Sequence, residues 1–245
     1  MEVLFSIITV TWNASGVILP TLESIKRQSF TGFEYLVIDG ASKDDTLKLV
    51  NQAEIPNCHV VSEPDSGLYD AMNKALAKAQ GKYLIWLNAG DAFATAHTLQ
   101  HMVHKAAGEP GVIYGQTRLV DMNRQVVGMR HLTAPQVLTW RSFKRGMVVC
   151  HQAFAARRDI APPYDLKYRF SADYDWCIRV LQASPCNAYV GDEPIIDFLT
   201  DGLTRKHHTA SLKERYRIMC HYYGTWPTIV RHLGFIPRFL TRKLS

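Results

Sequence analysis

The sequence predicts an α/β protein in which a mostly parallel sheet is flanked by helices. Two observations support this fold class. Short runs of β-branched and aromatic residues alternate with segments of helical periodicity, and the runs are apolar throughout, as in strands buried on both faces. A repeated order of strand, helix and strand implies a parallel sheet, because each helix returns the chain to the same end of the sheet. The 245 residues are enough for one large core.

Each element of the first half follows from this pattern. The first helix, for example, carries Val17, Ile18, Leu22 and Ile25 at the spacing that places apolar side chains on one face. The four expected strands cover residues 4–11, 34–38, 59–62 and 83–87, and the helices between them cover residues 17–28, 46–53 and 69–79.

The regular alternation ends after Asp91. Beyond it we expect a helix over residues 98–106, strands over 111–119, 125–129 and 148–155, and a helix over 172–182. The chain has no internal repeat and no low-complexity linker. We therefore expect one domain over residues 1–204 and an extension of different composition over residues 205–245.

Composition narrows the class of protein. The five cysteines are scattered, odd in number and include no CxxC pair, so neither a disulfide framework nor a zinc site is indicated, and a reducing compartment is expected. The N-terminal MEVLFSIITV has an acidic residue where a signal peptide is basic, and no stretch of the chain has the ~18 uninterrupted apolar residues of a membrane-spanning helix. We expect a cytoplasmic protein.

The net charge of +6 is concentrated in the extension. Residues 205–245 contain nine Lys and Arg against a single acid, Glu214, whereas residues 1–204 contain 19 basic and 21 acidic residues, a net charge of −2. This asymmetry argues against a basic nucleic-acid binder and for an extension that meets an anionic partner.

The end of the extension alternates apolar and cationic residues, in TWPTIVRHLGFIPRFLTRKLS from Thr225. We favour attachment to the anionic inner face of the cell membrane, because Pro237 interrupts any single long helix there. The alternative is a helix that packs on the domain with a solvated cationic face. A nucleic-acid arm is a further alternative, but it explains nothing about the segment from Ser62 to Asp91.

Polar residues follow each expected strand of the first half. In open parallel sheets ligands bind beyond the carboxyl ends of the strands, so chemistry is expected at these positions. The residues are Trp12 and Asn13, Asp39, Glu63 and Asp65, and the segment 88–91 with sequence NAGD.

The segment 62–91, SEPDSGLYDAMNKALAKAQGKYLIWLNAGD, resembles the family 2 glycosyltransferases. SIITVTWN and VIDGASKDDT before it and HQAF and SADYDW after it extend the resemblance over most of residues 4–204. The chain is most similar to enzymes of bacterial exopolysaccharide synthesis, including the colanic-acid type. The resemblance implies a Rossmann-like, GT-A-like fold in which residues 4–91 bind the nucleotide and residues 92–204 form the acceptor half.

The implied activity is the inverting transfer of a sugar from a UDP-, GDP- or dTDP-sugar to an acceptor hydroxyl, with a lipid-linked acceptor expected. The resemblance also implies nucleotide-binding roles for eight residues: Thr9, Thr11, Asn13, Asp39, Glu63, Asp65, Asn73 and Lys74. The residues themselves support part of this. Asp39 can accept a hydrogen bond from a base, Lys74 can face the diphosphate, and the loop after the first strand can supply a stacking surface. Asp39 and Gly40 alternatively form only a turn, and we expect Asp44 or Asp45 to cap the next helix.

A divalent cation, Mg2+ or Mn2+, is expected at Asp91. The family usually ends this strand with two neighbouring acids, and Gly90 stands where the first is common. One carboxylate can suffice, because diphosphate oxygens and water complete the octahedral shell. The alternative is a turn in which Asp91 caps a helix.

Asp173 in SADYDW aligns with the family's catalytic base, which would take the proton of the attacking hydroxyl. Asp175 is an alternative base or a residue of the acceptor pocket. His151 and Gln152 match a recurrent pair that lines the acceptor or sugar pocket, although His151 can equally be a satisfied core histidine. Arg205 and His207 are expected to close over the diphosphate.

The sequence disfavours two rival functions and leaves a third open. A sugar-nucleotide nucleotidyltransferase shares the alternation of strands and helices but needs a basic, Gly-rich loop after the first strand, where TVTWNASG has no basic residue. A dehydrogenase needs GxGxxG at that place, which is also missing. A degenerate transferase that only binds ligands stays open, because the acidic motif is thinned to Asp91.

Overall fold

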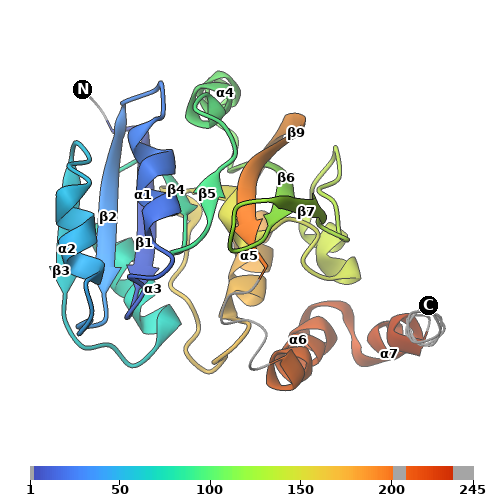
Figure 1. Ribbon diagram of the computed structural model, residues 1–245. Coiled ribbons are helices and arrows are strands. Elements are labelled where there is room, and N and C mark those ends of the chain that lie inside the picture. Colours follow the sequence, from blue (N-terminus) through green and yellow to red (C-terminus); the bar gives the residue numbers. More distant parts are fainter. Residues whose placement is uncertain (1–2, 201–207, 234–245) are drawn as a thin grey trace.

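The described part of the chain forms one nine-stranded sheet with helices on both faces (Figure 1). The computed structural model describes residues 3–200 and 208–233. The strand order is β3-β2-β1-β4-β8-β6-β9-β5, and β7 pairs with β6 outside this path. The α/β class predicted from the sequence is therefore confirmed.

The first half is the predicted parallel unit. Four parallel strands, neighbours in the order β3-β2-β1-β4, are joined by three helices. Every residue of β1, β2 and β4 is buried, as predicted. The prediction that the third strand is buried is wrong: no residue of β3 is buried, because β3 lies at the edge of the sheet. The elements are β1 (Phe5–Thr11), α1 (Leu19–Lys26), β2 (Phe33–Asp39), α2 (Thr46–Gln52), β3 (Cys58–Ser62), α3 (Leu68–Lys78) and β4 (Tyr83–Trp86).

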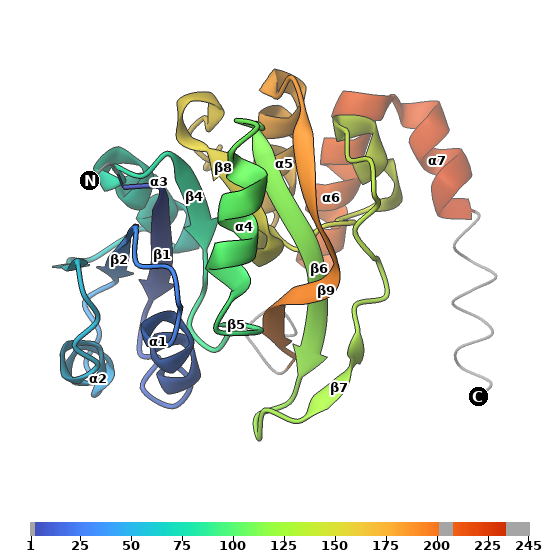
Figure 2. The same ribbon diagram turned by 90° about the horizontal axis from the view of Figure 1, so that it is seen from above.

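The helices of this unit cover both faces of the sheet. Figure 2 shows α3 on one side of β1 and β2, and α1 and α2 on the other. The α1 helix begins with Pro20 in its first turn, where a missing backbone N–H leaves no lost hydrogen bond. Leu22 and Ile25 of α1 and Met72 and Ala75 of α3 are buried against the sheet, so the core occupies both of its faces.

The second half extends the sheet with antiparallel and mixed pairing. The β8 strand runs antiparallel to β4 and β6, and the long β9 runs parallel to β6. The α4 helix packs against β6 and β9, as the contacts between these elements show. The elements are β5 (Ala92–Phe93), α4 (Thr98–Ala106), β6 (Val112–Val120), β7 (Val126–Met129), η1 (Trp140–Arg145), η2 (His151–Ala153), β8 (Phe154–Arg157), η3 (Arg158–Ile160), α5 (Ala172–Ala183) and β9 (Asn187–Leu199).

The strand predicted over residues 148–155 is wrong. The chain instead forms the short 3-10 helix η2, and β8 begins only at Phe154. All residues from Val148 to Ala155 are buried, and a continuous apolar run has no periodicity that separates a strand from a tight buried turn. This turn directs His151 and Gln152 into the interior.

Two C-terminal helices, α6 (His208–Tyr223) and α7 (Thr225–Leu233), lie together at the end of the molecule away from α2 (Figures 1 and 2). The α6 helix packs on the domain: Ile218 and Met219 are buried, and the Glu214 carboxylate accepts the N–H groups of Arg169 and Phe170 at 2.9 and 2.8 Å. Pro237 lies outside the described residues.

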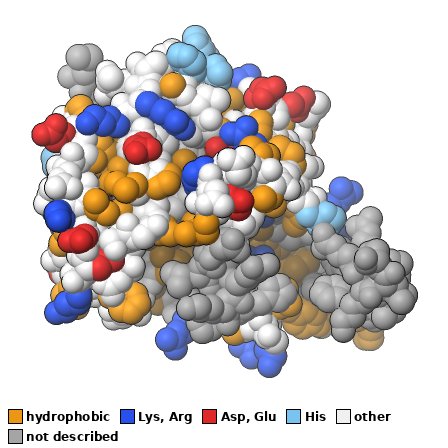
Figure 3. All heavy atoms as spheres, in the orientation of Figure 1, with side chains coloured by type: hydrophobic (Ala, Val, Ile, Leu, Met, Phe, Trp, Pro, Cys, Tyr) orange, Lys and Arg blue, Asp and Glu red, His pale blue; other side chains and the backbone are white. Residues whose placement is uncertain are grey.

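No helix in the described part of the chain combines the length and the hydropathy needed to cross a membrane. On the face seen in Figure 3, basic and acidic side chains are interspersed, without one large patch of a single sign.

Candidate active site

The carboxyl ends of β3, β2, β1 and β4 lie along one edge of the sheet, because these neighbouring strands are parallel. Ser62, Asp39 and Thr11 end the first three of these strands, and Asn88 follows β4. The residues that the sequence singled out after separate strands therefore share one edge, where open parallel sheets bind ligands.

Asp39 is fully buried at this edge, and its carboxylate is held by three donors. The Ser42 backbone N–H donates to Oδ2 at 2.9 Å, the Ser62 hydroxyl donates to the same oxygen at 2.7 Å, and the Ser42 hydroxyl donates to Oδ1. These bonds hold the carboxylate in one orientation. They also show that the turn after β2 is built around Asp39, and a nucleotide-binding role for Asp39 stays a prediction.

An exposed aromatic ring lies beside Gly40, the residue after Asp39. A Cβ at Gly40 would lie 2.6 Å from Oδ2 of Asp65 and 3.4 Å from Cδ1 of Trp12, so both side chains approach this glycine. Trp12 is 68% exposed, which is unusual for a tryptophan. An exposed indole near a carboxylate provides a surface on which a base can stack while an N–H group finds an acceptor.

The loop after β1 is tied to the loop after β2. The Asn13 N–H donates to the Ser42 hydroxyl at 2.8 Å, and the Lys43 N–H donates to Oδ1 of Asn13 at 2.8 Å. Asp44 accepts the N–H of Thr46, the first residue of α2, at 3.0 Å, so its predicted capping role is confirmed. Asp45 occupies the cap position itself, and no hydrogen bond of its side chain caps the helix.

Two buried polar atoms at this edge lack a hydrogen-bond partner among the described residues. They are Oγ1 of Thr11, at the end of β1, and Oδ1 of Asn88, after the neighbouring β4. Buried polar atoms in native proteins normally have a partner, and a polar ligand bound at the strand ends can supply one. Thr9, in contrast, is satisfied within the core, where its hydroxyl donates to the Leu87 carbonyl at 2.6 Å and accepts from Tyr35 at 3.1 Å.

Two polar residues of α3 are occupied by contacts within the protein. Nζ of Lys74 lies 2.8 Å from the Pro64 carbonyl and 3.0 Å from a carboxylate oxygen of Glu63, and the Glu63 hydrogen bond raises the pKa of Lys74. The Asn73 amide donates to the Tyr164 carbonyl and accepts the Tyr164 N–H at 2.7 Å. These bonds organise the loops beside α3, and nucleotide contacts by Glu63, Asn73 and Lys74 stay predictions.

Asp91 is buried and bonded through both of its carboxylate oxygens. Oδ1 accepts the Leu199 N–H at 2.9 Å, and Oδ2 accepts a hydrogen bond from Nε2 of Gln152 at 2.7 Å. Burial raises the pKa of Asp91 to about 7, although these bonds and the charge of Arg124 partly oppose the shift. The alternative role as a helix cap is wrong, because α4 begins at Thr98 with His97 at the cap.

Gly90 stands at the position where the family commonly has a further acid, and the Leu199 side chain occupies the space beside it. Gly90 has φ +99°, and a Cβ there would lie 2.8 Å from Cδ2 of Leu199. Nη1 of Arg124 donates to the Gly90 carbonyl at 2.7 Å. The described residues contain no group of three or more His, Cys, Asp or Glu side chains that could hold a metal ion. Asp91 alone, with both oxygens already accepting hydrogen bonds, would hold a divalent cation only together with the oxygens of a bound diphosphate, and its metal role stays a prediction.

Asp173 lies in the first turn of α5, half-buried, and joins the two halves of the chain. The Tyr69 hydroxyl of α3 donates to Oδ1 of Asp173 at 3.1 Å. The Tyr69 ring stacks on Tyr164 with centroids 5.6 Å apart. A carboxylate that is partly exposed and oriented by a neutral donor is suited to accept a proton.

A buried group of aromatic residues lies beneath this carboxylate. Trp86 stacks on His151 with centroids 5.8 Å apart, and Trp176 stacks on Tyr164 at 5.0 Å. Nε2 of His151 is 2.8 Å from the Tyr164 hydroxyl, and burial lowers the pKa of His151 to about 4, although the charge of Asp173 opposes this. His151 is therefore neutral near pH 7 and satisfied within the core, and its role in an acceptor pocket stays a prediction.

Asp175 is fastened to its neighbours and only 3% exposed. Nε of Arg179 donates to Oδ2 at 2.7 Å, and the Tyr222 hydroxyl donates to Oδ1 at 2.8 Å, which links α6 to α5. Of the two acids in SADYDW, Asp173 is the more accessible. An acceptor role for Asp175 stays a prediction, and Arg205 and His207 lie outside the described residues.

A chain of contacts runs from Asp91 to Asp173. Gln152 bonds Asp91, and the adjoining His151 lies 2.8 Å from the Tyr164 hydroxyl. The Tyr164 ring stacks on Tyr69, whose hydroxyl donates to Asp173. The η2 turn and its aromatic neighbours thus connect the two acids, and a cleft shared by both carboxylates stays a prediction.

Three residues of this region were missed by the sequence analysis. Tyr69 lies within the motif YDAMNK, so its place in the segment that carries the family resemblance was a usable signal. Arg124, in the turn between β6 and β7, and Leu199, at the end of β9, have no sequence feature that marks them. Strand pairing in the second half of the sheet brings Arg124 and Leu199 next to Gly90 and Asp91.

Comparison with known proteins gives a family and a fold. The model of the family described as glycosyl transferase family 2 matches residues 6–162. A PGL/p-HBAD biosynthesis glycosyltransferase of Mycobacterium tuberculosis is 36% identical over 185 residues, which are 72% of this chain and 69% of the relative. The Escherichia coli UDP-Glc:alpha-D-GlcNAc-diphosphoundecaprenol beta-1,3-glucosyltransferase WfgD is 22% identical over 188 residues, 76% of this chain and 73% of WfgD.

Solved structures share the GT-A architecture. Staphylococcus aureus TarS 1–349 in complex with UDP-GlcNAc matches with a TM-score of 0.69 at 18% identity, over 88% of this chain and 64% of TarS 1–349. The mannosyltransferase PcManGT of Pyrobaculum calidifontis in complex with GDP-Man and Mn2+ matches with a TM-score of 0.60 at 17% identity, over 87% and 63%. The match spans less than two thirds of each of these solved chains.

Proposed function

This chain belongs to glycosyl transferase family 2, and from that premise we propose that it transfers a sugar from a nucleoside diphosphate sugar to an acceptor hydroxyl with inversion at the anomeric carbon. One observation carries the proposal. At the carboxyl ends of β1 and β4, where open parallel sheets bind ligands, Oγ1 of Thr11 and Oδ1 of Asn88 are buried without a partner among the described residues, next to the exposed ring of Trp12.

The donor nucleoside is assigned to the edge formed by β1, β2 and β3. We propose that the base stacks on Trp12 and bonds Asp39 or Asp65, and that Thr11 and Asn88 meet the ribose or the diphosphate. TarS and PcManGT, which share the fold, were solved with UDP-GlcNAc and GDP-Man. Of the three donor classes expected from the sequence, UDP- and GDP-sugars thus have precedents on this fold, and a dTDP-sugar stays a prediction.

Asp173 is assigned as the base. As the acceptor hydroxyl attacks the anomeric carbon, its proton passes to Asp173, the bond between that carbon and the diphosphate oxygen breaks, and the nucleoside diphosphate leaves with the electron pair. Because the nucleophile enters opposite the leaving group, the configuration inverts. Tyr69 orients the carboxylate through its hydroxyl.

Metal dependence is a separate proposal, with Asp91 as the protein ligand for Mg2+ or Mn2+. It is supported by the Mn2+ in PcManGT, which shares the fold. A cation at Asp91 would have to share the carboxylate with the hydrogen bonds from Gln152 and Leu199.

The acceptor is proposed to be lipid-linked, as in bacterial surface polysaccharide synthesis. The name of WfgD specifies a diphosphoundecaprenol acceptor, and the relative from M. tuberculosis is a glycosyltransferase of PGL/p-HBAD biosynthesis. The cationic residues after 204 support a peripheral position on the inner face of the cell membrane. In this proposal residues 4–91 bind the nucleotide, residues 92–204 form the acceptor half, and residues 205–245 attach to the membrane.

A donor panel tests the proposal. UDP-, GDP- and dTDP-sugars are added with and without Mn2+, and the melting temperature and the release of nucleoside diphosphate are measured. We expect one base class to stabilise the protein, because a ligand that binds only the folded state raises its stability. If no nucleotide sugar changes the melting temperature, the assignment of the strand edge to a donor is wrong.

A degenerate transferase that binds its donor without turnover is the second candidate. Two features of the segment NAGD favour this candidate. Gly90 supplies no carboxylate, and both oxygens of Asp91 accept hydrogen bonds from Gln152 and Leu199. Donor binding without any release of nucleoside diphosphate, in the presence of membrane extracts that supply acceptors, would support this alternative.

A further inference from the structure

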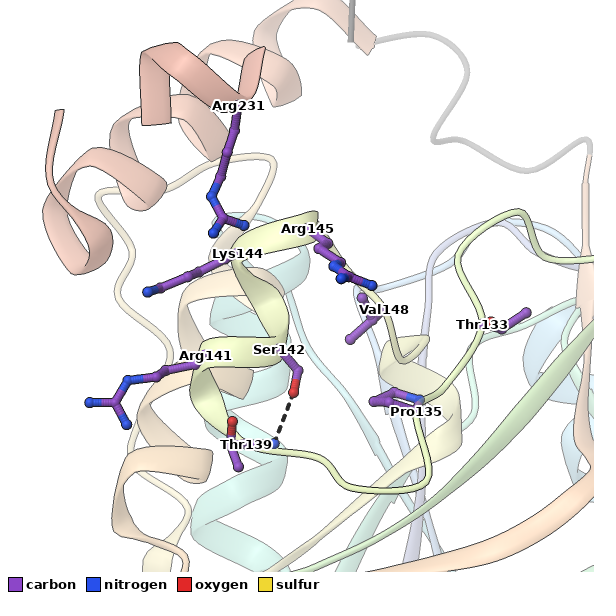
Figure 4. Close-up of a pocket in the computed structure, with 9 residues that line it drawn as sticks. All are labelled: Thr133, Pro135, Thr139, Arg141, Ser142, Lys144, Arg145, Val148 and Arg231. Carbon is purple, nitrogen blue, oxygen red and sulfur yellow. Dashed lines mark hydrogen bonds between the residues drawn. The ribbon is translucent and has the colours of Figure 1, made fainter. Parts of the chain in front are cut away.

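A cationic pocket lies between η1 and α7, outside the candidate active site (Figure 4). Its cavity volume is about 420 Å3. Three basic side chains come from η1, namely Arg141, Lys144 and Arg145, and Arg231 reaches toward them from α7. The remaining lining is neutral, and no acid takes part. We call this cavity the η1–α7 pocket.

None of the ion pairs among the described residues includes any of these four cations. Two of them lie over aromatic rings instead: Arg141 is 4.8 Å from the ring centroid of Trp140, and Lys144 is 5.5 Å from that of Tyr223. The Tyr223 hydroxyl donates to the Trp140 carbonyl, which fastens η1 to α6. Aromatic contacts thus position Arg141 and Lys144 on η1, and no carboxylate in the lining offsets the positive charge of the pocket.

Exposed apolar side chains accompany the pocket. Val137, in the loop that leads into η1, is 78% exposed, and on α7 Trp226 and Val230 are 78% and 65% exposed. Trp226 and Val230 are four residues apart and so share one face of α7, and Val230 directly precedes Arg231. A soluble anion such as free phosphate would need only the cations of the pocket in order to bind. Cations beside apolar groups on a terminal helix fit an anion that carries a hydrocarbon chain.

The pocket adjoins the element that bears the proposed base. Phe143 of η1 is fully buried, and its carbonyl accepts a hydrogen bond from the Tyr174 hydroxyl at 2.6 Å. Tyr174 follows Asp173 directly on α5. A ligand held by η1 is thus anchored on an element that packs against the helix of the base.

We propose that the η1–α7 pocket binds the diphosphate of the lipid-linked acceptor while Trp226 and Val230 contact the lipid. The inference rests on the proposed function, because it names how that acceptor is held. Arginine side chains bind phosphate oxygens in pairs, and a diphosphate diester offers two charges to cations that come from two elements. This pocket separates recognition of the acceptor's phosphate group from recognition of the donor's diphosphate, which lies at the strand ends.

The test uses the full chain and vesicles of phosphatidylcholine that carry a small fraction of farnesyl diphosphate. The variant R145Q/R231Q removes one cation from each element, and both residues are exposed, so the fold should be retained. K26Q/K105Q is the matched control, because it removes two exposed cations of α1 and α4, outside the pocket. We expect R145Q/R231Q to weaken binding about tenfold or more and the control to leave it unchanged.

Two further arms separate the sources of phosphate. Vesicles with phosphatidylglycerol at the same surface charge should bind the wild-type protein more weakly, and inorganic pyrophosphate should compete for the diphosphate vesicles. Equal binding to both kinds of vesicle, no competition by pyrophosphate, or no effect of R145Q/R231Q would each overturn the proposal.

Stabilisation by the nucleotide sugar is measured on the same variants. If it survives in R145Q/R231Q while vesicle binding falls, the pocket acts on the acceptor side alone, as proposed. If the wild-type protein binds diphosphate vesicles but no donor, the proposed transferase function is contradicted and the proposal for the η1–α7 pocket is supported. If the wild-type protein binds a donor but does not prefer diphosphate vesicles, the proposal for the η1–α7 pocket is contradicted and the proposed transferase function is supported.

Discussion

Gln152 holds the buried carboxylate of Asp91, with its amide nitrogen 2.7 Å from Oδ2, and the Leu199 N–H holds the other oxygen. These contacts join residues that are 61 and 108 positions apart. They connect the end of β4, the η2 turn and β9, so one acid sets how the two halves of the sheet meet.

The raised pKa of Asp91 predicts stability that depends on pH. Its pKa is about 7 in the folded protein against 3.8 without burial, so the folded state binds the proton more tightly. The free energy of unfolding should therefore fall as the pH rises from 4 to 7, by up to about 4 kcal/mol from this group. D91N removes this contribution, and Gln152 can turn its amide to accept from the new Asn. Urea unfolding at pH 5 and 8 measures the effect.

The comparison is made between variant and wild type, because buried His151, with its pKa lowered to about 4, acts in the opposite direction. D45N is the control, since the Asp45 side chain is 71% exposed. An unchanged pH dependence in D91N would show that Asp91 is not the titrating group.

The contact between Gly90 and Leu199 predicts a steric coupling. G90A should lower the free energy of unfolding by about 1–3 kcal/mol, because the new Cβ meets Cδ2 of Leu199 and the backbone has φ +99°. Removing that atom in G90A/L199A should relieve the clash but not the backbone strain. A double-mutant cycle from urea unfolding measures the coupling. Strict additivity of the two substitutions would contradict the contact.

The proposed base predicts a selective loss of turnover. D173N should lower kcat about 10²- to 10⁴-fold, since the hydroxyl proton then has no acceptor. Donor binding, measured by thermal stabilisation, should persist. Y69F should have a smaller effect on kcat and shift its pH profile, because Tyr69 only orients the carboxylate. Transfer by D173N at the wild-type rate would remove the base assignment.

The proposed metal ligand is tested by the same Asp91 variant in a different assay. If Asp91 holds Mn2+, adding Mn2+ with the nucleotide should raise the melting temperature of the wild-type protein more than nucleotide alone, and D91N should lose this increment. Wild-type activity that survives chelation by EDTA would instead agree with the carboxylate being committed to Gln152 and Leu199.

The exposed indole of Trp12 predicts a binding defect without a folding defect. W12A should weaken donor binding about tenfold or more, because stacking of one base contributes about 1–3 kcal/mol. The melting temperature of the free protein should be unchanged, since Trp12 is 68% exposed. V137A, at a similarly exposed residue beside the η1–α7 pocket, is the control, and equal donor affinity in both variants would contradict stacking.

The parallel half of the fold was predictable because its signals are local. Buried runs such as that of β1 show no polar alternation, and each is followed by a helical pattern, so strand order and ligand edge follow from general rules of α/β folds. Capping by Asp44 was also predictable, since it depends on neighbours in sequence.

The remainder depends on contacts between distant residues. The burial of Asp91, the position of Arg124 and the filling of the Gly90 position by Leu199 all arise from strand pairing in the second half, which no local pattern encodes. The η2 turn was missed because an apolar run is compatible with several backbone conformations. Residues in the described part could thus be nominated from the sequence, but their partners could not.

Four of the five tryptophans occupy three different optical environments, and the fifth, Trp140, is stacked on Tyr223. Trp86 and Trp176 lie in the buried aromatic group around His151. Trp12 is exposed to solvent at the strand edge, and Trp226 is exposed to solvent on α7. Fluorescence from the first pair reports the integrity of the interior, whereas quenching or a blue shift at Trp12 or Trp226 reports the arrival of a nucleotide or of a lipid. Single-tryptophan versions of the chain can therefore follow each event separately, without a label.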